Sequence, residues 1–364
     1  MNLELSDEQI FLRDAARDAL SRSNTLEAAR ATLDGGDRPD EWPVAVEAGW
    51  SGLLVSDENG GAGLGAFDAM LVMQEAGRRL SGVELLGHLP ASLLLDLASH
   101  DSAQAAAAGE RRAVFAGAVP PGDLDSEWTV DSVAGMTRVP APTFDGSSLD
   151  GEVAWVVDAP GADVFVVVAT QDGSPVVVVT EDVPVEEVFR YDPTRRLGHL
   201  TFSSTPATRL DVPEAEIERA WYLAQALLAA ESVGAVEACL EMAVAYAKER
   251  FTFGRAIGSY QAIKHGLVEI MRRGENAKSL LYYAGWAHES GPEEFAIAAS
   301  AARSAAGEAL DYAARENIAV HGGIGATWEH DAPLFFRRAQ LSRRLLGGLG
   351  DATDRVAEEL LSAA

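Results

Sequence analysis

Residues 153–181 read VAWVVDAPGADVFVVVATQDGSPVVVVTE, and this stretch decides the fold class. Short valine-rich runs alternate with Ala-Pro-Gly-Ala-Asp and Gln-Asp-Gly, two segments made of turn-forming residues. β-Branched side chains favour strands, whereas glycine, proline and aspartate favour the turns between them. Similar runs extend the pattern over about 112–212. The spacing predicts an antiparallel barrel or sandwich and does not choose between the two.

The segments on both sides of this β region have helical patterns. Ser6 followed by Gln9 is a capping-box signature ahead of an amphipathic run. Residues 214–250 are apolar on nearly every face, as expected for a helix packed between others in a bundle. We therefore expect an α+β chain of three domains: a helical N-terminal domain at 1–111, a middle β domain at 112–212 and a helical C-terminal domain at 213–364.

The composition excludes several classes of function. Asp and Glu number 56 against 29 Lys and Arg, and the net charge of −27 argues against binding to nucleic acid. The single cysteine and seven scattered histidines predict neither a disulfide framework nor a metal site. The acidic N-terminus does not resemble a signal peptide, and the longest apolar stretch, 221–240, contains Gln225 and Glu231. These features predict a cytoplasmic protein without a membrane span.

Two stretches in the C-terminal region carry residue types that can bind a cofactor. In AKERFTFGRAIGSYQAIKH (247–265), Arg250 and Arg255 could hold a pyrophosphate, Phe253 could pack on a flat ring and Gln261 could meet an adenine edge. The alternative is a helix–turn–helix corner with solvated arginines and a core phenylalanine. In VHGGIGATWEHDAP (320–333), the glycines either let a ligand approach the backbone or form a tight turn.

Together and in this order, these stretches resemble the acyl-CoA dehydrogenase family over essentially the whole chain. Further matching segments are WPVAVEAGWSGLLVSDENGGAGLG (42–65), LDGEVAWVVDAPGADVFVVVA (149–169) and YDPTRRLGHLTF (191–202). The resemblance implies a helical N-domain, a middle β-barrel and a C-terminal four-helix bundle, usually assembled as a dimer of dimers. It implies FAD as cofactor and α,β-dehydrogenation of an acyl-CoA thioester in fatty acid or steroid side-chain degradation. A glutamate removes the α-proton, the β-hydride passes to FAD, and electrons leave to an electron-transferring flavoprotein.

The resemblance also assigns cofactor-binding residues. Four positions match the family's contacts to the pyrophosphate and adenosine half of an FAD that usually belongs to the neighbouring subunit: Arg250, Thr252, Phe253 and Gln261. Three more match the glycine turn that completes this cleft: Gly322, Gly323 and Gly325. Trp155 matches the family's tryptophan beside the flavin ring, although a barrel-core tryptophan is the alternative. Asp192, Thr194 and Arg195 match a family segment that we interpret as structural.

The family's catalytic glutamate is missing. In most members it lies in a turn whose sequence here is Leu346-Gly347. In others it lies on the first long C-terminal helix, at the position of Ala224. Neither leucine nor alanine can accept a proton. The family's flavin-contacting loop corresponds to AGAVPPGD (116–123), and Val157 stands where a hydroxyl residue is usual.

These departures leave several hypotheses open. The chain resembles the base-lacking subunits of heteromeric actinobacterial members that act on steroid side-chain CoA thioesters, in which a related subunit supplies the glutamate. A self-sufficient homomer would need a relocated base, for which Glu231, seven residues past Ala224, is a weak candidate. A third possibility is a non-redox use of the fold, as an acyl-CoA-binding or hydratase-like protein. A purely structural subunit is the fourth.

Overall fold

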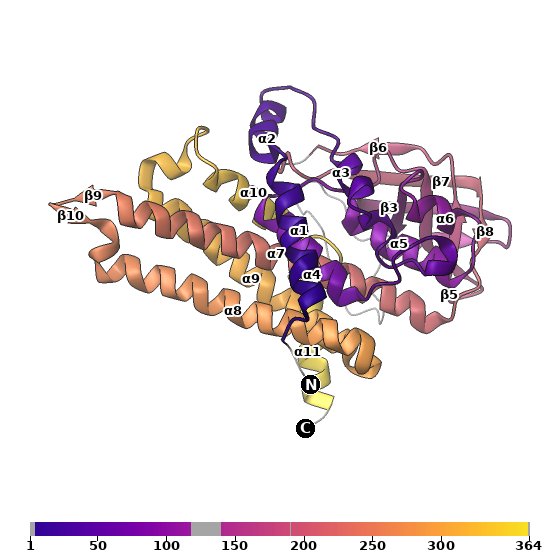
Figure 1. Cartoon of the computed structure of the whole chain (residues 1–364). Helices are drawn as coiled ribbons and strands as arrows, with labels where there is room; N and C mark the ends of the chain where they lie inside the picture. Colours follow the sequence, from indigo (N-terminus) through magenta and orange to yellow (C-terminus); the bar gives the residue numbers. More distant parts are fainter. Residues whose placement is uncertain (1–3, 118–139, 190, 363–364) are drawn as a thin grey trace.

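The computed structural model describes residues 4–117, 140–189 and 191–362. N-terminal helices, a curled β-sheet and a C-terminal helical bundle follow one another along the chain (Figure 1). The N-terminal helices are α1 Asp7–Ser21, α2 Thr25–Leu33, α3 Trp42–Glu47, α4 Ala66–Arg78, α5 Leu85–Leu97 and α6 Ser102–Ala107. The capping box predicted at the start of α1 is confirmed, because the backbone N–H of Gln9 donates to Ser6 Oγ and that of Ser6 donates to Gln9 Oε1.

The described residues in the middle of the chain form one eight-stranded sheet. Its strands are β1 Ala113–Ala116, β2 Thr143–Phe144, β3 Ser148–Val157, β4 Val164–Gln171, β5 Ser174–Thr180, β6 Val185–Glu187, β7 Leu197–Pro206 and β8 Thr208–Arg209. They follow the order β6-β7-β3-β2-β4-β5-β8, with β1 also on β4. The purely antiparallel expectation is wrong for β1 and β2, which run parallel to β4. Parallel strands need a crossover connection, and hairpin-like spacing along the sequence does not reveal one.

Both faces of this sheet are buried. In β4, Phe165 and Val167 belong to a core enclosed by the sheet itself, together with residues of β1, β3, β5 and β7. Val164 and Val166 alternate with them and join a second core on the helical side. The sheet therefore curls around its own interior as a barrel does, and among the described strands β6 and β8 are the two ends of its hydrogen-bonded path.

The C-terminal region is built on three long helices. They are α7 Glu214–Glu249, α8 Gln261–Ser290 and α9 Phe295–His321, followed by η5 Gly322–Ala326, α10 Ala332–Ser342 and α11 Gly348–Ser362. A hairpin of β9 Phe251–Thr252 and β10 Arg255–Ala256 joins α7 to α8 at one tip of the molecule (Figure 1). The long helices pack pairwise, and α10 and α11 both pack on α9. The predicted four-helix bundle is present, with α10 and α11 sharing the fourth position.

The two helical regions share one hydrophobic core. A single cluster of buried side chains includes residues of α4, α5, α7 and α9 and of the helical face of the sheet. Because α4 and α5 pack on α7 from outside the bundle, α7 is covered on several sides, as its nearly all-apolar sequence predicts. Among the described helices, none combines the length and apolar character that a membrane crossing requires.

Candidate functional site

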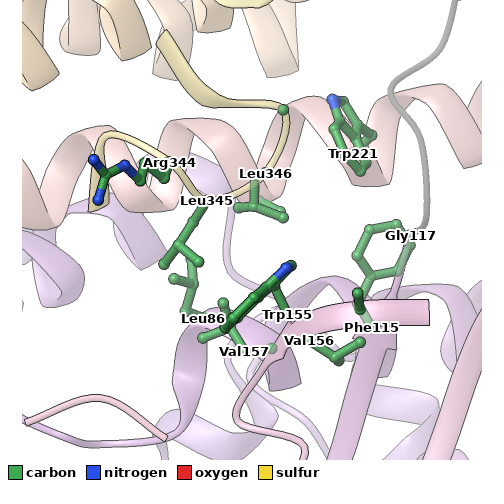
Figure 2. Close-up of a pocket in the computed structure, with 14 residues that line it drawn as sticks. Leu86, Phe115, Gly117, Trp155, Val156, Val157, Trp221, Arg344, Leu345 and Leu346 are labelled. Atoms are coloured by element: carbon green, nitrogen blue, oxygen red, sulfur yellow. The ribbon is translucent and has the colours of Figure 1, made fainter. Parts of the chain in front are cut away.

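A cavity lies where the N-terminal helices, the sheet and the bundle meet (Figure 2). Its lining residues come from α5, β1, β3, α7 and the turn after α10: Leu86, Gly87, Phe115, Gly117, Ala154, Trp155, Val156, Val157, Trp221, Ala224, Arg344, Leu345, Leu346 and Gly347. The structure therefore brings together Leu346 and Ala224, the two positions at which the resemblance leads us to expect a glutamate. Trp155 lies in the same cavity.

Leu346 stands in a turn with an unusual backbone. Leu346, Gly347 and Gly348 have φ angles of 52°, 84° and 79°, in the left-handed region that glycine adopts readily and leucine does not. Such a conformation in a non-glycine residue costs on the order of 1–3 kcal/mol. The surrounding helices hold it in place, because Gln225 Nε2 of α7 donates to the Leu346 carbonyl at 2.9 Å and Arg303 of α9 donates to the Leu345 carbonyl at 3.4 Å.

Trp155 enters the cavity from a bulge in β3. The register between β3 and β7 shifts between Val153 and Val156, and Trp155 has a φ of 60°. A bulge of this kind re-aims a side chain, and the indole here packs edge-to-face on His199 with centroids 4.6 Å apart. Trp155 belongs to the helical-side core and not to the sheet's interior core. The alternative of a barrel-core tryptophan is therefore wrong.

The cavity does not fit a flavin ring with an acyl chain. Its volume is about 50 Å³, whereas small-molecule sites usually measure roughly 300–1,000 Å³. A Cβ atom added at Gly117 would lie 2.9 Å from the Trp221 indole, so these residues are already in close contact. Among the described residues of the lining, Arg344 is the one with an ionisable side chain, and a guanidinium cannot accept a proton. The described part of the cavity thus offers neither room for a flavin ring nor a proton acceptor.

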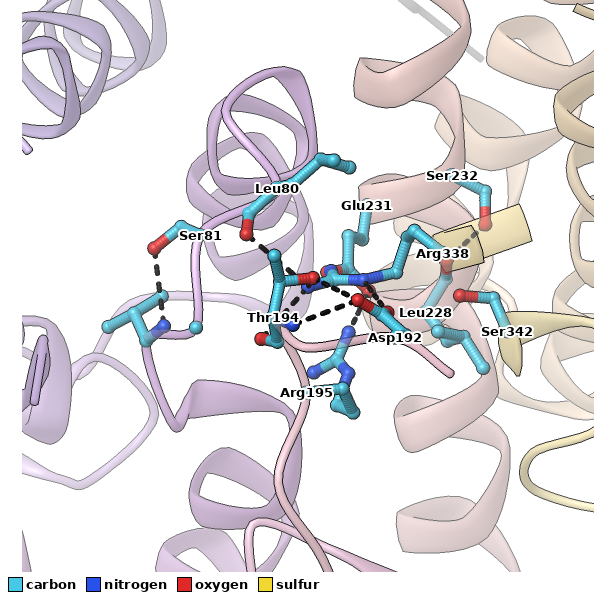
Figure 3. Close-up of polar contacts among 12 residues, drawn as sticks. Leu80, Ser81, Asp192, Thr194, Arg195, Leu228, Glu231, Ser232, Arg338 and Ser342 are labelled. Atoms are coloured by element: carbon cyan, nitrogen blue, oxygen red, sulfur yellow. Dashed lines mark hydrogen bonds and ion pairs between the residues drawn. The ribbon is translucent and has the colours of Figure 1, made fainter. Parts of the chain in front are cut away.

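Glu231, the candidate relocated base, lies outside this cavity. Its side chain is 2% exposed, and its two carboxylate oxygens accept hydrogen bonds from Arg195 and Arg338 (Figure 3). A general base must reach the proton that it removes. Since both oxygens are bonded to arginines away from the cavity, the geometry supports the structural interpretation of Glu231.

The cluster around Glu231 ties the three parts of the chain together. Arg338 of α10 also donates to Asp192 Oδ2 at 2.7 Å, to the Thr194 carbonyl at 3.1 Å and to the Leu80 carbonyl at 3.3 Å. Burial lowers the pKa of Arg338 to about 10, so it stays charged at neutral pH. Burial alone would raise the pKa of Asp192, but Arg338 and Thr194 outweigh it and leave that pKa below its ordinary value. Asp192 and Arg338 therefore form a charged pair inside the protein.

The predicted adenosine-site residues lie at the far tip of the bundle. Arg250 ends α7, Thr252 and Phe253 belong to the β9–β10 hairpin, and Gln261 begins α8. All four are exposed, and Phe253, with a φ of 49°, is 94% exposed. The alternative of a core phenylalanine is therefore wrong, since Phe253 contacts little within this chain.

The three glycines after α9 differ in what they pack against. Gly322 has a φ of 64°, and a Cβ added at Gly322 or Gly323 would meet nothing within 4 Å. A Cβ at Gly325 would lie 2.7 Å from the Ile318 carbonyl oxygen, so Gly325 is explained by packing inside the chain. Gly322 and Gly323 leave open space against which a ligand could lie, whereas Gly325 fits the tight-turn alternative.

The two groups of predicted residues are far apart. Ala224 in the cavity and Arg250 at the tip are separated by 26 residues of α7 and its C-cap, about 39 Å at about 1.5 Å per residue. Figure 1 shows the hairpin at the end of the bundle opposite the sheet. One bound dinucleotide cannot reach both places in a single chain.

Comparison with known proteins decides the family. One family model, the acyl-CoA dehydrogenase N-terminal domain, matches residues 6–104, and another, the acyl-CoA dehydrogenase C-terminal domain, matches residues 218–361. A relative, acyl-CoA dehydrogenase IpdE2 of Mycobacterium tuberculosis, is 32% identical over 357 residues, which cover 97% of this chain and 98% of IpdE2. The chain belongs to the acyl-CoA dehydrogenase family.

Solved acyl-CoA dehydrogenase structures have the same fold. A variant of the Tcur3481-Tcur3483 steroid ACAD matches with a TM-score of 0.85 and 26% identity, covering 98% of each chain. The ChsE4-ChsE5 complex from Mycobacterium tuberculosis matches with a TM-score of 0.86, covers 99% of each chain and is 22% identical, which shows a shared fold.

Some features of this acyl-CoA dehydrogenase site were not found from the sequence. The buried Arg338 and the hydrogen bond from Gln225 to Leu346 join elements that are distant along the chain, so no local pattern reveals them. Trp221 of α7 lines the cavity and is also part of the buried core. In the altered flavin loop, residues 118–123 lie outside the described part of the chain, whereas Val157 lines the cavity with an apolar side chain.

Proposed function

We propose that this chain is the base-lacking subunit of a heteromeric acyl-CoA dehydrogenase. A second, related subunit supplies the glutamate and the site for the FAD ring, and this chain binds the adenosine half of that FAD with the tip of its bundle. The assembly catalyses α,β-dehydrogenation of an acyl-CoA thioester and passes electrons to an electron-transferring flavoprotein.

The observation that carries this proposal is the cavity at Leu346. Removing the α-proton of a thioester needs a proton acceptor within about 3 Å. Leu346 and Ala224, the two positions where the resemblance places that acceptor, line one cavity of about 50 Å³, and the only ionisable side chain among its described lining residues is an arginine. This chain keeps the family's fold but lacks a proton acceptor and space for the flavin ring. A partner subunit that has both would account for the combination.

The far tip of the bundle supports the same assembly. Arg250 and Gln261 offer exposed polar groups, and Phe253 offers an exposed ring. At the C-terminal end of α9, Gly323 leaves open space. A guanidinium binds phosphate oxygens in a forked geometry, and an aromatic ring can pack on a flat heterocycle. Because this tip lies about 39 Å along α7 from the cavity, the FAD that it contacts has its ring in another subunit.

The relatives support the proposal in a second way. The steroid ACAD and the ChsE4-ChsE5 complex each carry two subunit names, which indicates assemblies of two different chains. By this likeness we infer a hetero-oligomer here and an acyl-CoA from steroid degradation as its substrate class. The self-sufficient homomer is the weaker alternative, because Glu231 is bonded to Arg195 and Arg338.

Restoring the glutamate should not restore activity to the isolated chain. In Leu346→Glu, the carboxylate enters a cavity of about 50 Å³ that does not fit a flavin ring, so no hydride acceptor stands beside it. Anaerobic titration of the purified variant with short, long and steroid-derived acyl-CoA esters should show no flavin bands that bleach. Leu346→Ala is the matched control without a carboxylate. Substrate-dependent bleaching in Leu346→Glu alone would show that the cavity accepts FAD and would contradict the proposal.

A further inference from the structure

A second, larger groove runs beside α10 on the outside of the bundle. Its volume is about 560 Å³, within the usual range for small-molecule sites, roughly 300–1,000 Å³. Four apolar residues of α9, α10 and the segment between them, Ile318, Ala326, Pro333 and Phe336, form much of its lining. The groove therefore offers a ligand-sized apolar surface outside the small cavity at Leu346.

Two arginines of this groove have no carboxylate partner among the described residues. Arg337 and Arg344 both line it, and neither forms an ion pair within the described ranges. Arg343, the residue before Arg344, does form an ion pair, with its Nη1 3.8 Å from Asp311 Oδ1. An acidic side chain is therefore present near this part of α10. In a chain with 56 acidic and 29 basic residues, two unpaired guanidinium groups in one groove are unexpected. Their charge is complementary to a negatively charged occupant.

Both guanidinium groups are held in place by contacts within the chain. Arg337 Nη1 donates to the Tyr191 carbonyl at 2.6 Å, and its guanidinium lies 5.1 Å from the centre of the Trp328 ring. Arg344 Nη1 donates to Tyr191 Oη at 2.7 Å. A guanidinium has five N–H donors, so each keeps donors for a ligand. Because the side chains are already ordered, binding loses less conformational entropy.

We propose that this groove binds a small apolar organic acid. The carboxylate of the ligand accepts hydrogen bonds from Arg337 and Arg344 beside Tyr191, and its apolar body packs on Ile318, Pro333 and Phe336. A carboxylate matches the forked donors of arginine. An inorganic anion fits the groove less well, because it would lose its strong hydration against the apolar lining. Arg344 also lines the Leu346 cavity, so the bound acid would lie next to the turn that holds Leu346.

Equilibrium dialysis of the full chain with radiolabelled octanoate tests this proposal. Octanoate should bind saturably below its micelle concentration and more weakly at high salt, and neutral octan-1-ol should bind much less. A charge-assisted hydrogen bond is worth about 1.5–3 kcal/mol, so Arg337→Gln and Arg344→Gln should each weaken octanoate binding by about tenfold or more. Arg343→Gln is the matched control and should bind octanoate as the unaltered chain does, because Arg343 does not line the groove.

Three results would overturn the proposal. They are no saturable octanoate binding, equal binding of octanoate and octan-1-ol, and equal weakening by Arg343→Gln and Arg344→Gln. Arg344 is exposed, so its replacement should leave the fold intact, which circular dichroism checks. The measurement needs neither FAD nor a second subunit, so it is independent of the function proposed above.

Discussion

Glu231→Gln should lower the free energy of unfolding by about 3–5 kcal/mol, because it leaves two buried arginines without one of their carboxylates. Glu231 and Arg338 are 2% and 1% exposed on their side chains, and Arg195 is 1% exposed. Glutamine keeps the shape of glutamate but not its charge. Denaturant unfolding of the purified chain, followed by circular dichroism, measures the change.

A surface acid on another helix provides the control. Glu269 on α8 forms ion pairs with Arg272 and Arg273, and its side chain is 30% exposed. Exposed ion pairs contribute little to stability, so Glu269→Gln should leave the denaturant midpoint of unfolding nearly unchanged. If Glu231→Gln proves as stable as the unaltered chain yet abolishes turnover, Glu231 is the relocated base and the structural interpretation is wrong.

If the chain works in the proposed heteromer, Arg250→Gln should weaken the binding of FAD to that heteromer about tenfold to a hundredfold. One lost charge-assisted hydrogen bond to a phosphate is worth about 1.5–3 kcal/mol. Phe253→Ala should also weaken it, because the ring has little else to contact at 94% exposure. Dialysis of the purified heteromer against dilutions of FAD, with flavin absorbance as the readout, measures both variants.

Stability measurements separate cofactor contact from folding in these variants. Since Arg250 and Phe253 are exposed, their replacement should leave the unfolding of the isolated chain unchanged within about 0.5 kcal/mol. Arg272→Gln, an exposed position elsewhere on α8, should leave FAD affinity unchanged. Unaltered FAD affinity in both Arg250→Gln and Phe253→Ala would remove the tip of the bundle from the cofactor site.

The sequence predicts the order of helical and β regions well, because valine-rich runs and helical periodicity are local signals. The capping box at Ser6 and the long buried α7 are clear examples. The parallel pairing of β1 and β2 with β4 was not predicted, since it joins segments that are not neighbours in the chain.

In the candidate site, too, some features could be predicted from the sequence and others could not. Resemblance identified Leu346 and Ala224 as empty base positions, and the structure places both in one cavity, although they are 122 residues apart. That Glu231 is bonded to Arg195 and Arg338 could not be predicted, because the three residues lie in separate parts of the chain. The volume of the cavity could not be predicted either, because it depends on how closely Trp221 approaches Gly117.

The central claim is that this chain lacks a working flavin-ring site and base, and the visible spectrum tests it most directly. The spectrum is recorded first for this chain purified alone, and then for the chain co-expressed with base-containing relatives from the same genome. The account predicts a colourless protein, or flavin bands that no acyl-CoA bleaches, for the chain alone. With the second subunit, the complex should be yellow and should bleach on anaerobic addition of its acyl-CoA substrate. Flavin bands that bleach in the chain alone would contradict the account, because they would show a working ring site and a base within this chain.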